Sequence, residues 1–263
     1  MTATYTSLEI ERAAQVATIW MNRPEVFNAF DETLIHELSE ACAALDADAS
    51  VRVVVLAGRG RHFSAGADLN WMKRASAGSH DDNLQDARRF AAMLQRLSTM
   101  SKPTIARVQG LALGGGTGLA AACDIALATE DAAFATSEVK FGIIPSVISP
   151  YVLRAIGPRH ALRYFQSAER ISAQRAQAIG LVSEVLPAAQ IDAAIAELAQ
   201  ALMSGGPQAQ IAAKALIASV SGRTVDASLI EETAQRISRQ RATDEAKNGI
   251  SAFLEKRQPA WLL

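Results

Sequence analysis

The chain has 263 residues, of which 49% are hydrophobic and 20% charged, so it can bury a substantial core and is not expected to be disordered. Its 26 Lys and Arg against 27 Asp and Glu give a net charge of -1, without the basic excess typical of nucleic-acid binders. Two cysteines, with no paired Cys or Cys/His spacing, exclude a disulfide framework and a zinc site and favour a reducing cytoplasm.

The sequence predicts neither a secretory signal nor a membrane span. Its first ten residues are polar and mixed, which is not typical of a signal peptide. Two long uncharged stretches, both with Gly or Pro inside, are residues 108–123 and 141–153. Both are shorter than the roughly 20 apolar residues that cross a bilayer.

In the first half, short β-branched runs alternate with helical patterns. Residues 16–20 and 51–56 are predicted strands, and Asp31 lies where it can cap a helix between them. Further elements are expected in this order: a helix over 81–99, a strand over 104–108, a glycine-rich turn, a short helix over 119–123, and strands over 124–128 and 133–135. Such interleaving of strands and helices indicates an α/β fold.

The second half is rich in alanine and has helical periodicity from about residue 157 onward. Helices are expected over residues 160–166, 173–179, 188–203, 208–220 and 226–256, separated by Gly and Pro. No internal repeat or flexible linker separates the two halves, so we expect helices to cover a sheet-based core.

Several familiar kinds of site are disfavoured by their spacing. The glycines of residues 114–118 lack the spacing of a dinucleotide fingerprint, and the chain has no Gly-Lys-Ser/Thr phosphate loop. Ser64 lacks the leading glycine of a nucleophile elbow, and none of the four histidines has an evident partner pattern. A nucleotide enzyme and a serine hydrolase are therefore poor interpretations.

Three other segments share a physical theme. Residues 63–69 and 110–116 are rich in small side chains, which let a ligand approach backbone N–H groups, and the second segment opens a helix. Glu138 is a lone carboxylate between apolar stretches, where burial would raise its pKa toward that of a general base. Together they predict an oxyanion hole beside a base. The alternatives are ordinary tight turns and a structural or helix-capping carboxylate.

Taken in order, these segments resemble the enoyl-CoA hydratase/isomerase family, the crotonase superfamily, over nearly the whole chain. Chance is an implausible source of so many ordered matches. They lie at residues 22–30 (NRPEVFNAF), 63–69 (FSAGADL), 102–106, 110–116 (GLALGGG), 123–126, 134–138, 142–145, 178–182 and 252–257.

The resemblance implies a crotonase-like spiral of ββα units, with residues 1–200 as the core that binds acyl-CoA. Residues 201–263 would form a helical region for oligomerisation and for covering the active site, in a homotrimer or homohexamer. Coenzyme A would be part of the substrate, so no separate cofactor and no metal are expected. Neither a nucleic acid nor a membrane is expected as a partner.

The resemblance also assigns roles to individual residues. Ala67 and Gly115 match the positions whose N–H groups hold the thioester oxygen, and Glu138 matches the acid/base. Residues along the coenzyme A moiety would be Ala65, Asp68 and Leu69, with Asn28 and Ala29 near its adenine pocket. Phe253 and Lys256 match C-terminal positions that reach a neighbouring subunit's coenzyme.

Gly118 departs from the best-known hydratases of the family, which have a first glutamate at this position. Glu138 alone could hydrate a 2,3 double bond or move it as an isomerase, and a non-catalytic acyl-CoA binder is a further alternative. Residues 136–140 and 145–152 resemble the subgroup that hydrates branched, carboxylated substrates. These are methylglutaconyl-CoA in leucine breakdown and carboxygeranoyl-CoA in terpene breakdown. We therefore expect an enoyl-CoA hydratase.

Overall fold

The computed structural model describes residues 5–262 and divides into two compact units. The first takes in the described residues up to Met100 together with Thr104–Ala196. The second consists of Ser101–Pro103 and the described residues from Glu197 onward.

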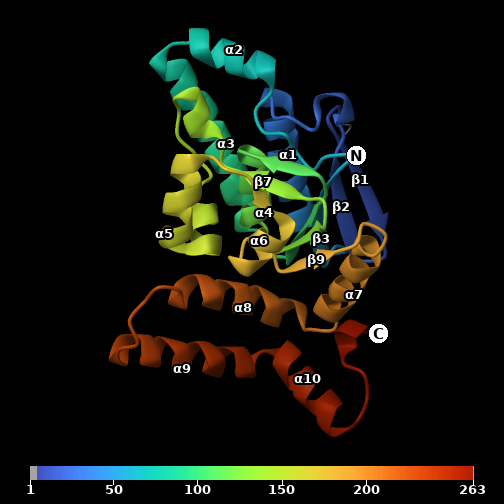
Figure 1. The fold of residues 1–263 in the computed structure, drawn as a ribbon. Helices are drawn as coiled ribbons and strands as arrows, with labels where there is room; N and C mark the ends of the chain where they lie inside the picture. The colour runs from blue at the N-terminus through green and yellow to red at the C-terminus, as the bar shows by residue number, and fades with distance from the viewer. Residues whose placement is uncertain (1–4, 263) are drawn as a thin grey trace. The chain divides into compact units, whose positions relative to one another are not determined.

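A six-stranded sheet forms the centre of the first unit, in the order β1-β2-β3-β4-β6-β9 (Figure 1). β1 and β2 are antiparallel, and every other neighbouring pair is parallel. The strands are β1 (Leu8–Ala13), β2 (Val16–Met21), β3 (Val53–Gly58), β4 (Thr104–Val108), β6 (Ile125–Thr129) and β9 (Glu184–Leu186). β3 is buried along its whole length, as its continuous apolar run predicts for a parallel strand covered on both faces.

A second, three-stranded sheet has the order β5-β7-β8. Its strands are β5 (Leu111–Leu113), β7 (Ala133–Ala135) and β8 (Ile171–Ser172). Two isolated parallel bridges, Phe30 with Ala67 and Ser64 with Ala112, connect neighbouring loops to this region. The bridges bring the segment after β3 beside the segment that leads into the next helix.

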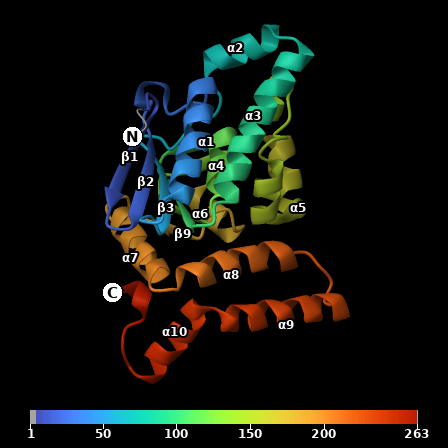
Figure 2. The ribbon, with the colours of Figure 1, turned by 180° about the vertical axis from the view of Figure 1, so that it is seen from behind.

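Helices flank these sheets, and α1 and α3 lie side by side (Figure 2). The helices are α1 (Glu32–Ala47), α2 (Leu69–Ala77), α3 (His80–Ser98), α4 (Gly115–Ala122), α5 (Ser149–Ser167) and α6 (Ala173–Ala178), with 3-10 helices η1 (Pro24–Val26) and η2 (Glu138–Phe141). The predicted cap of α1 is confirmed, because the Asp31 carboxylate accepts the Leu34 N–H at 2.8 Å. α7 (Ile191–Met203) begins in the first unit and ends in the second.

The second unit contains α8 (Pro207–Val220), α9 (Ala227–Ala242), α10 (Asp244–Leu254) and the 3-10 helix η3 (Ala260–Leu262). α8 and α9 run side by side in opposite directions (Figure 1). The Glu245 carboxylate of α10 accepts the N–H groups of Gln208 and Ala209, at 2.9 and 2.8 Å, and so caps α8. No helix within residues 5–262 is both long and apolar enough to cross a bilayer.

Three helices differ from the predicted ranges for local reasons. The helix expected over 226–256 is interrupted at Thr243, whose hydroxyl caps α10 by accepting the Ala246 N–H at 3.1 Å. α5 begins at Ser149 rather than at residue 160, and it is kinked at Gly157, where φ is 71°. α4 begins at Gly115 rather than at residue 119, because the glycine run itself winds the first turn.

Candidate active site

A single cavity of about 730 Å³ brings the predicted catalytic residues together. Its wall is built from the 65–69 segment, α2, α3, the start of α4, and the chain from Ser137 to Ile148. Ala67, Gly115 and Glu138 all line it. The volume lies within the range typical of small-molecule sites, about 300 to 1,000 Å³.

Ala67 is held by its neighbours while its own N–H stays unused. The Phe30 N–H donates to Gly66 O at 2.7 Å, and the Asp68 N–H donates to Phe30 O at 2.8 Å. Gly66 has φ 94°, and a Cβ there would lie 2.9 Å from Leu113 O, so only glycine allows this close approach. Among residues 5–262, no backbone carbonyl accepts the Ala67 N–H.

Gly115 is the first residue of α4, so its N–H has no acceptor within the helix. No backbone carbonyl outside the helix takes it either, within the described part of the chain. Gly114, with φ 50° and ψ -115°, sets this turn and donates its N–H to Ala135 O at 2.7 Å. The helix dipole adds partial positive charge at this end.

Glu138 begins η2 and lies directly beside this turn. A Cβ on Gly114 would be 3.1 Å from Glu138 Oε1. Glu138 Oε2 is buried and has no hydrogen-bond partner among the described residues. Burial raises the pKa of this carboxyl above that of an exposed glutamate, and the hydrogen bond from its own N–H offsets only part of the rise. A partly buried, incompletely solvated carboxylate therefore faces the cavity.

The rest of the wall is largely apolar. The Phe90 ring lies 5.3 Å from the Phe30 ring and 6.5 Å from the Trp71 ring, between their centroids. The Trp71 indole N–H donates to Asp86 at 3.1 Å. Asp86 and Glu138 are the charged side chains among the lining residues, and no Lys, Arg or His is included in that set.

Ile148 occupies the space above Gly118. A Cβ on Gly118 would be 2.2 Å from Ile148 Cγ2 and 2.8 Å from Ile148 Cβ. Ile148 is 2% exposed and lines the cavity. An isoleucine therefore fills the place into which a side chain at position 118 would project.

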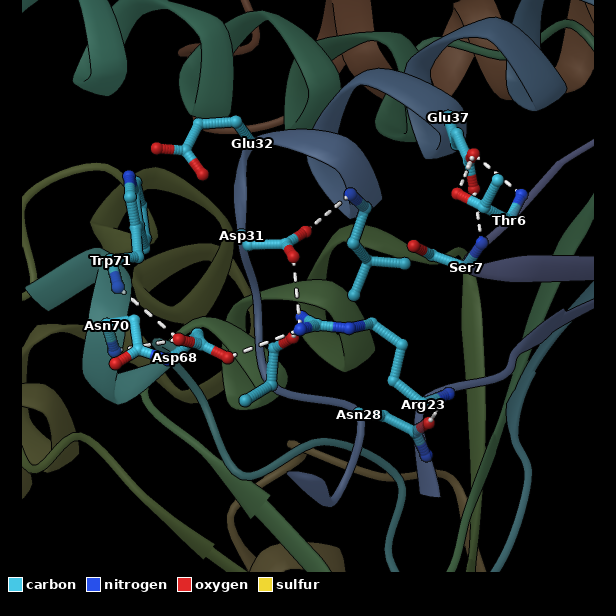
Figure 3. Close-up of polar contacts among 12 residues, drawn as sticks. Thr6, Ser7, Arg23, Asn28, Asp31, Glu32, Glu37, Asp68, Asn70 and Trp71 are labelled. Carbon is cyan, nitrogen blue, oxygen red and sulfur yellow. Dashed lines mark hydrogen bonds and ion pairs between the residues drawn. The ribbon is translucent and has the colours of Figure 1, made fainter. Parts of the chain in front are cut away.

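Of the predicted binding residues that follow the strand β3, Ala65 and the exposed Leu69 line the cavity, and Asp68 does not. Asp68 is buried, and its carboxylate accepts the N–H of Asn70 at 2.8 Å and of Trp71 at 3.3 Å at the start of α2 (Figure 3). Those hydrogen bonds and Arg23 outweigh the effect of burial and hold the pKa of Asp68 below its usual value.

The remaining predicted binding residues do not line the cavity. Asn28 is buried, and its side chain bonds Arg23 N, Arg59 O and His62 O, while Ala29 is 6% exposed. Phe253 and Lys256 are exposed residues of the second unit. Their predicted roles stay predictions.

Sequence reasoning missed Phe30, Trp71, Phe90 and Ile148 as wall residues, because only the tertiary fold brings their side chains to one cavity. Phe30 and Ile148 stand inside or beside matched motifs, which is the only signal the sequence offered. Within residues 5–262, no group of three or more His, Cys, Asp or Glu is arranged to hold a metal ion.

Comparison with known proteins identifies the class that this fold and site define. The sequence profile of the family "Enoyl-CoA hydratase/isomerase" matches residues 11–262. The chain is 36% identical to the 2,3-dehydroadipyl-CoA hydratase of Escherichia coli, over 96% of this chain and 97% of that protein. It is 33% identical to the crotonyl-CoA hydratase of Syntrophomonas wolfei, over 97% of each.

A crystal structure of an enoyl-CoA hydratase from Shewanella pealeana has the same fold, with a TM-score of 0.95, 39% identity, and coverage of 97% of this chain and 96% of that one. The chain belongs to the enoyl-CoA hydratase/isomerase family and is an enzyme of the crotonase fold.

Proposed function

We propose that the enzyme adds water across the 2,3 double bond of an enoyl-CoA thioester. In this proposal, the N–H groups of Ala67 and Gly115 hold the thioester oxygen, and Glu138 is the acid/base. The observation that carries the proposal is the buried Glu138 Oε2, which has no partner among residues 5–262, in the same cavity as two N–H groups that no backbone carbonyl of those residues accepts. The names of the relatives support hydration.

The reaction balances with one carboxylate. Ionised Glu138 takes a proton from water while the water oxygen bonds to C3 of the substrate. The electrons of the double bond move through C2 and C1 to the thioester oxygen, whose negative charge the two N–H groups stabilise. Protonated Glu138 then gives its proton to C2, which restores the carboxylate and completes the addition of water.

Both proton transfers are assigned to the same residue because Gly118 supplies no carboxylate and Asp86, the other carboxylate of the lining, accepts the Trp71 indole N–H. Gly118 stands where the best-known hydratases have a glutamate, and Ile148 fills the adjoining space. The hydroxyl and the proton are therefore added to the same face of the double bond. Isomerisation, in which Glu138 would move a proton between C2 and C4, is the competing reaction of the same site.

The lining residues favour an uncharged acyl group. A substrate with a second carboxylate, as in methylglutaconyl-CoA or carboxygeranoyl-CoA, needs a cation or several donors, and no cation lines the cavity. The side-chain donors of Trp71, Ser76 and Asn83 are already bonded to Asp86, Lys73 O and Ala75 O, which leaves the hydroxyls of Ser137 and Ser146 as the other side-chain donors of the lining. We therefore expect a carboxylated enoyl-CoA to have a higher KM than an apolar one of equal length.

The decisive experiment replaces the base. Glu138→Gln should lower the turnover of crotonyl-CoA by about 100- to 10,000-fold and change its binding little. Turnover is followed by the loss of the ultraviolet absorbance of the conjugated thioester. Glu130→Gln, on the exposed turn between β6 and β7, is the matched control and should keep wild-type turnover.

Separate incubations with 2-enoyl-CoA and 3-enoyl-CoA distinguish hydration from a moved double bond. Unchanged turnover in Glu138→Gln contradicts the assignment of the base. Tight binding of coenzyme A esters without turnover by the wild-type chain points to a non-catalytic binder instead.

We also propose that the chain forms a homotrimer or homohexamer. Large apolar side chains are exposed on the second unit, among them Ile217 at 67%, Val225 at 77% and Phe253 at 82%. Exposed apolar groups of this kind are typical of surfaces that a second copy covers. Light scattering should give three or six times the 27.9 kDa mass of one chain, and a monomer contradicts this proposal. A cytoplasmic location stays a prediction, supported by the absence of a disulfide between the buried Cys42 and Cys123.

A further inference from the structure

The Arg23 guanidinium joins the starts of two helices beside the cavity (Figure 3). Its side chain is 17% exposed, and Nη2 lies 3.0 Å from Asp31 Oδ2 and 3.3 Å from Asp68 Oδ2. Nη1 donates to Ala29 O at 2.6 Å. Asp31 begins α1 and Asp68 begins α2, so one cation pairs with both capping carboxylates. We call Arg23, Asp31, Asp68 and Ala29 O the Arg23 cluster.

In each carboxylate of the cluster, one oxygen caps a helix and the other pairs with Arg23. Asp31 Oδ1 accepts the Leu34 N–H, and Asp68 Oδ1 accepts the Asn70 and Trp71 N–H groups. The Oδ2 atom of each faces Arg23. All four groups are therefore satisfied within the cluster. An anionic ligand such as a phosphate would meet two carboxylates here, so the cluster is not a binding site for one.

The Arg23 cluster lies beside the isolated bridge that pairs Phe30 with Ala67. Phe30 brackets Ala67 through its own N–H and carbonyl, which bond Gly66 O and the Asp68 N–H. Arg23 contacts both neighbours of Phe30 on one strand of this bridge, and the residue after Ala67 on the other. The guanidinium therefore links the two segments of this bridge at the residues next to Phe30 and Ala67.

The Phe30 ring extends this control to the second N–H group. A Cβ on Gly115 would lie 2.8 Å from Phe30 Cε2, so ring and glycine are in direct contact. Phe30 thus touches the Ala67 segment with its backbone and Gly115 with its side chain. Arg23 bonds Ala29 O and pairs with Asp31, the two neighbours of Phe30, so it constrains the residue that contacts both segments.

We propose that Arg23 and Asp68 are positioning residues that keep the Ala67 N–H aimed at the thioester oxygen, an inference that rests on the proposed function. Only arginine can do this, because its planar fork spans several acceptors, whereas lysine offers one compact ammonium. An error of about 1 Å in such a group costs about 100-fold in rate.

The test compares Arg23→Lys with Arg107→Lys. Arg107 is an equally buried arginine, 15% exposed, that pairs with Asp192 through two nitrogens and does not line the cavity. Arg23→Lys should lower kcat for crotonyl-CoA by about 10- to 100-fold and leave KM within about threefold. Arg107→Lys should keep the wild-type kcat even where it loses as much stability.

A spectroscopic probe reports the position of the N–H groups directly. Bound 4-aminobenzoyl-CoA, an aromatic thioester with no double bond to hydrate, absorbs at longer wavelength when its carbonyl is polarised. The wild type, Glu138→Gln and Arg107→Lys should each show this red shift, and Arg23→Lys should lose most of it. If Arg23→Lys does not fold, Asp68→Asn provides the test, because asparagine keeps the acceptor for the α2 cap and removes the anionic oxygen that faces Arg23.

The two proposals fail in different ways. Absence of a red shift in the wild type contradicts the N–H pair of the proposed function. A red shift and a kcat in Arg23→Lys or Asp68→Asn that equal those of Arg107→Lys overturn the positioning role and leave the proposed function standing.

Discussion

The contact between Gly118 and Ile148 allows a stability prediction to be worked out from distances. In Gly118→Ala, the new Cβ would lie 2.2 Å from Ile148 Cγ2, whereas carbon atoms pack at about 3.5 to 4.0 Å. Overpacking of this kind costs about 1 to 3 kcal/mol. Replacing a helical glycine by alanine returns about 1 kcal/mol. The net expectation is a loss of about 1 kcal/mol, or about 2 to 4 °C in Tm.

A double-mutant cycle isolates the clash. Ile148→Ala alone removes Cγ2 and should cost about 2 to 5 kcal/mol, because it leaves a cavity. In the Gly118→Ala background, the same change also removes the 2.2 Å overlap with Cγ2, whereas the 2.8 Å approach to the Cβ that alanine keeps remains, so the two effects should be non-additive by about 1 kcal/mol or more. Ile148→Val is the matched control. Valine keeps Cγ2, so the clash persists and its effect should add to that of Gly118→Ala.

The assay is urea-induced unfolding followed by circular dichroism, at one fixed protein concentration because association adds to apparent stability. Additivity of Gly118→Ala and Ile148→Ala within about 0.5 kcal/mol would refute the reasoning. An equal coupling energy for the valine pair would do the same, since it would show that Cγ2 is not the atom in conflict.

Three further predictions concern the residues around the two N–H groups. Burial raises the pKa of Glu138, which must be ionised to act as the base. The fall of kcat at low pH should therefore have its midpoint above about pH 4.3, where an exposed glutamate titrates. A midpoint at or below that pH contradicts the assignment. The lowered pKa of Asp68 adds stability that is present above about pH 3.9 and is lost as pH falls through the folded pKa. Asp68→Asn should therefore reduce the urea midpoint at pH 7, with a gap from wild type that narrows on acidification and not one that stays constant. Gly114→Ala should cost about 1 to 3 kcal/mol and lower kcat, since φ is 50° and the Cβ would crowd Glu138. Gly142→Ala, at φ 72° with no atom within 4 Å, should lose only stability, and equal kcat in both variants argues against the crowding.

The sequence predicted elements whose cause is local. β4 and β7 have the predicted bounds, and Asp31 caps α1 as its position before an apolar helical pattern indicates. The helix of residues 69–77 was missed, because it spans only nine residues and its start depends on Asp68, whose second carboxylate oxygen is held by Arg23.

For the candidate site too, the sequence indicated some residues, and only the fold showed the contacts between others. Glu138 and the two glycine-rich segments were accessible from composition and motif, because the chemistry requires those residue types in themselves. The sequence showed that Gly118 stands where the best-known hydratases have a glutamate, but it did not show which residue packs against Gly118. Ile148 is separated from Gly118 by thirty positions, and only the packing of α5 against α4 brings the two into contact.

The exposed part of the cavity wall, at residues 141–144, differs from the part that contains the predicted catalytic residues. Ala67 and Gly115 lie on segments tied to buried strands and helices. Phe141, which ends η2, and Ile143 and Ile144, which follow the left-handed Gly142, are 62%, 54% and 72% exposed. Substitutions at Phe141, Ile143 and Ile144 should therefore disturb the buried core little. Such substitutions would change which acyl groups the cavity accepts and would leave Ala67, Gly115 and Glu138 in place. This is a physical route by which one fold could act on different thioesters.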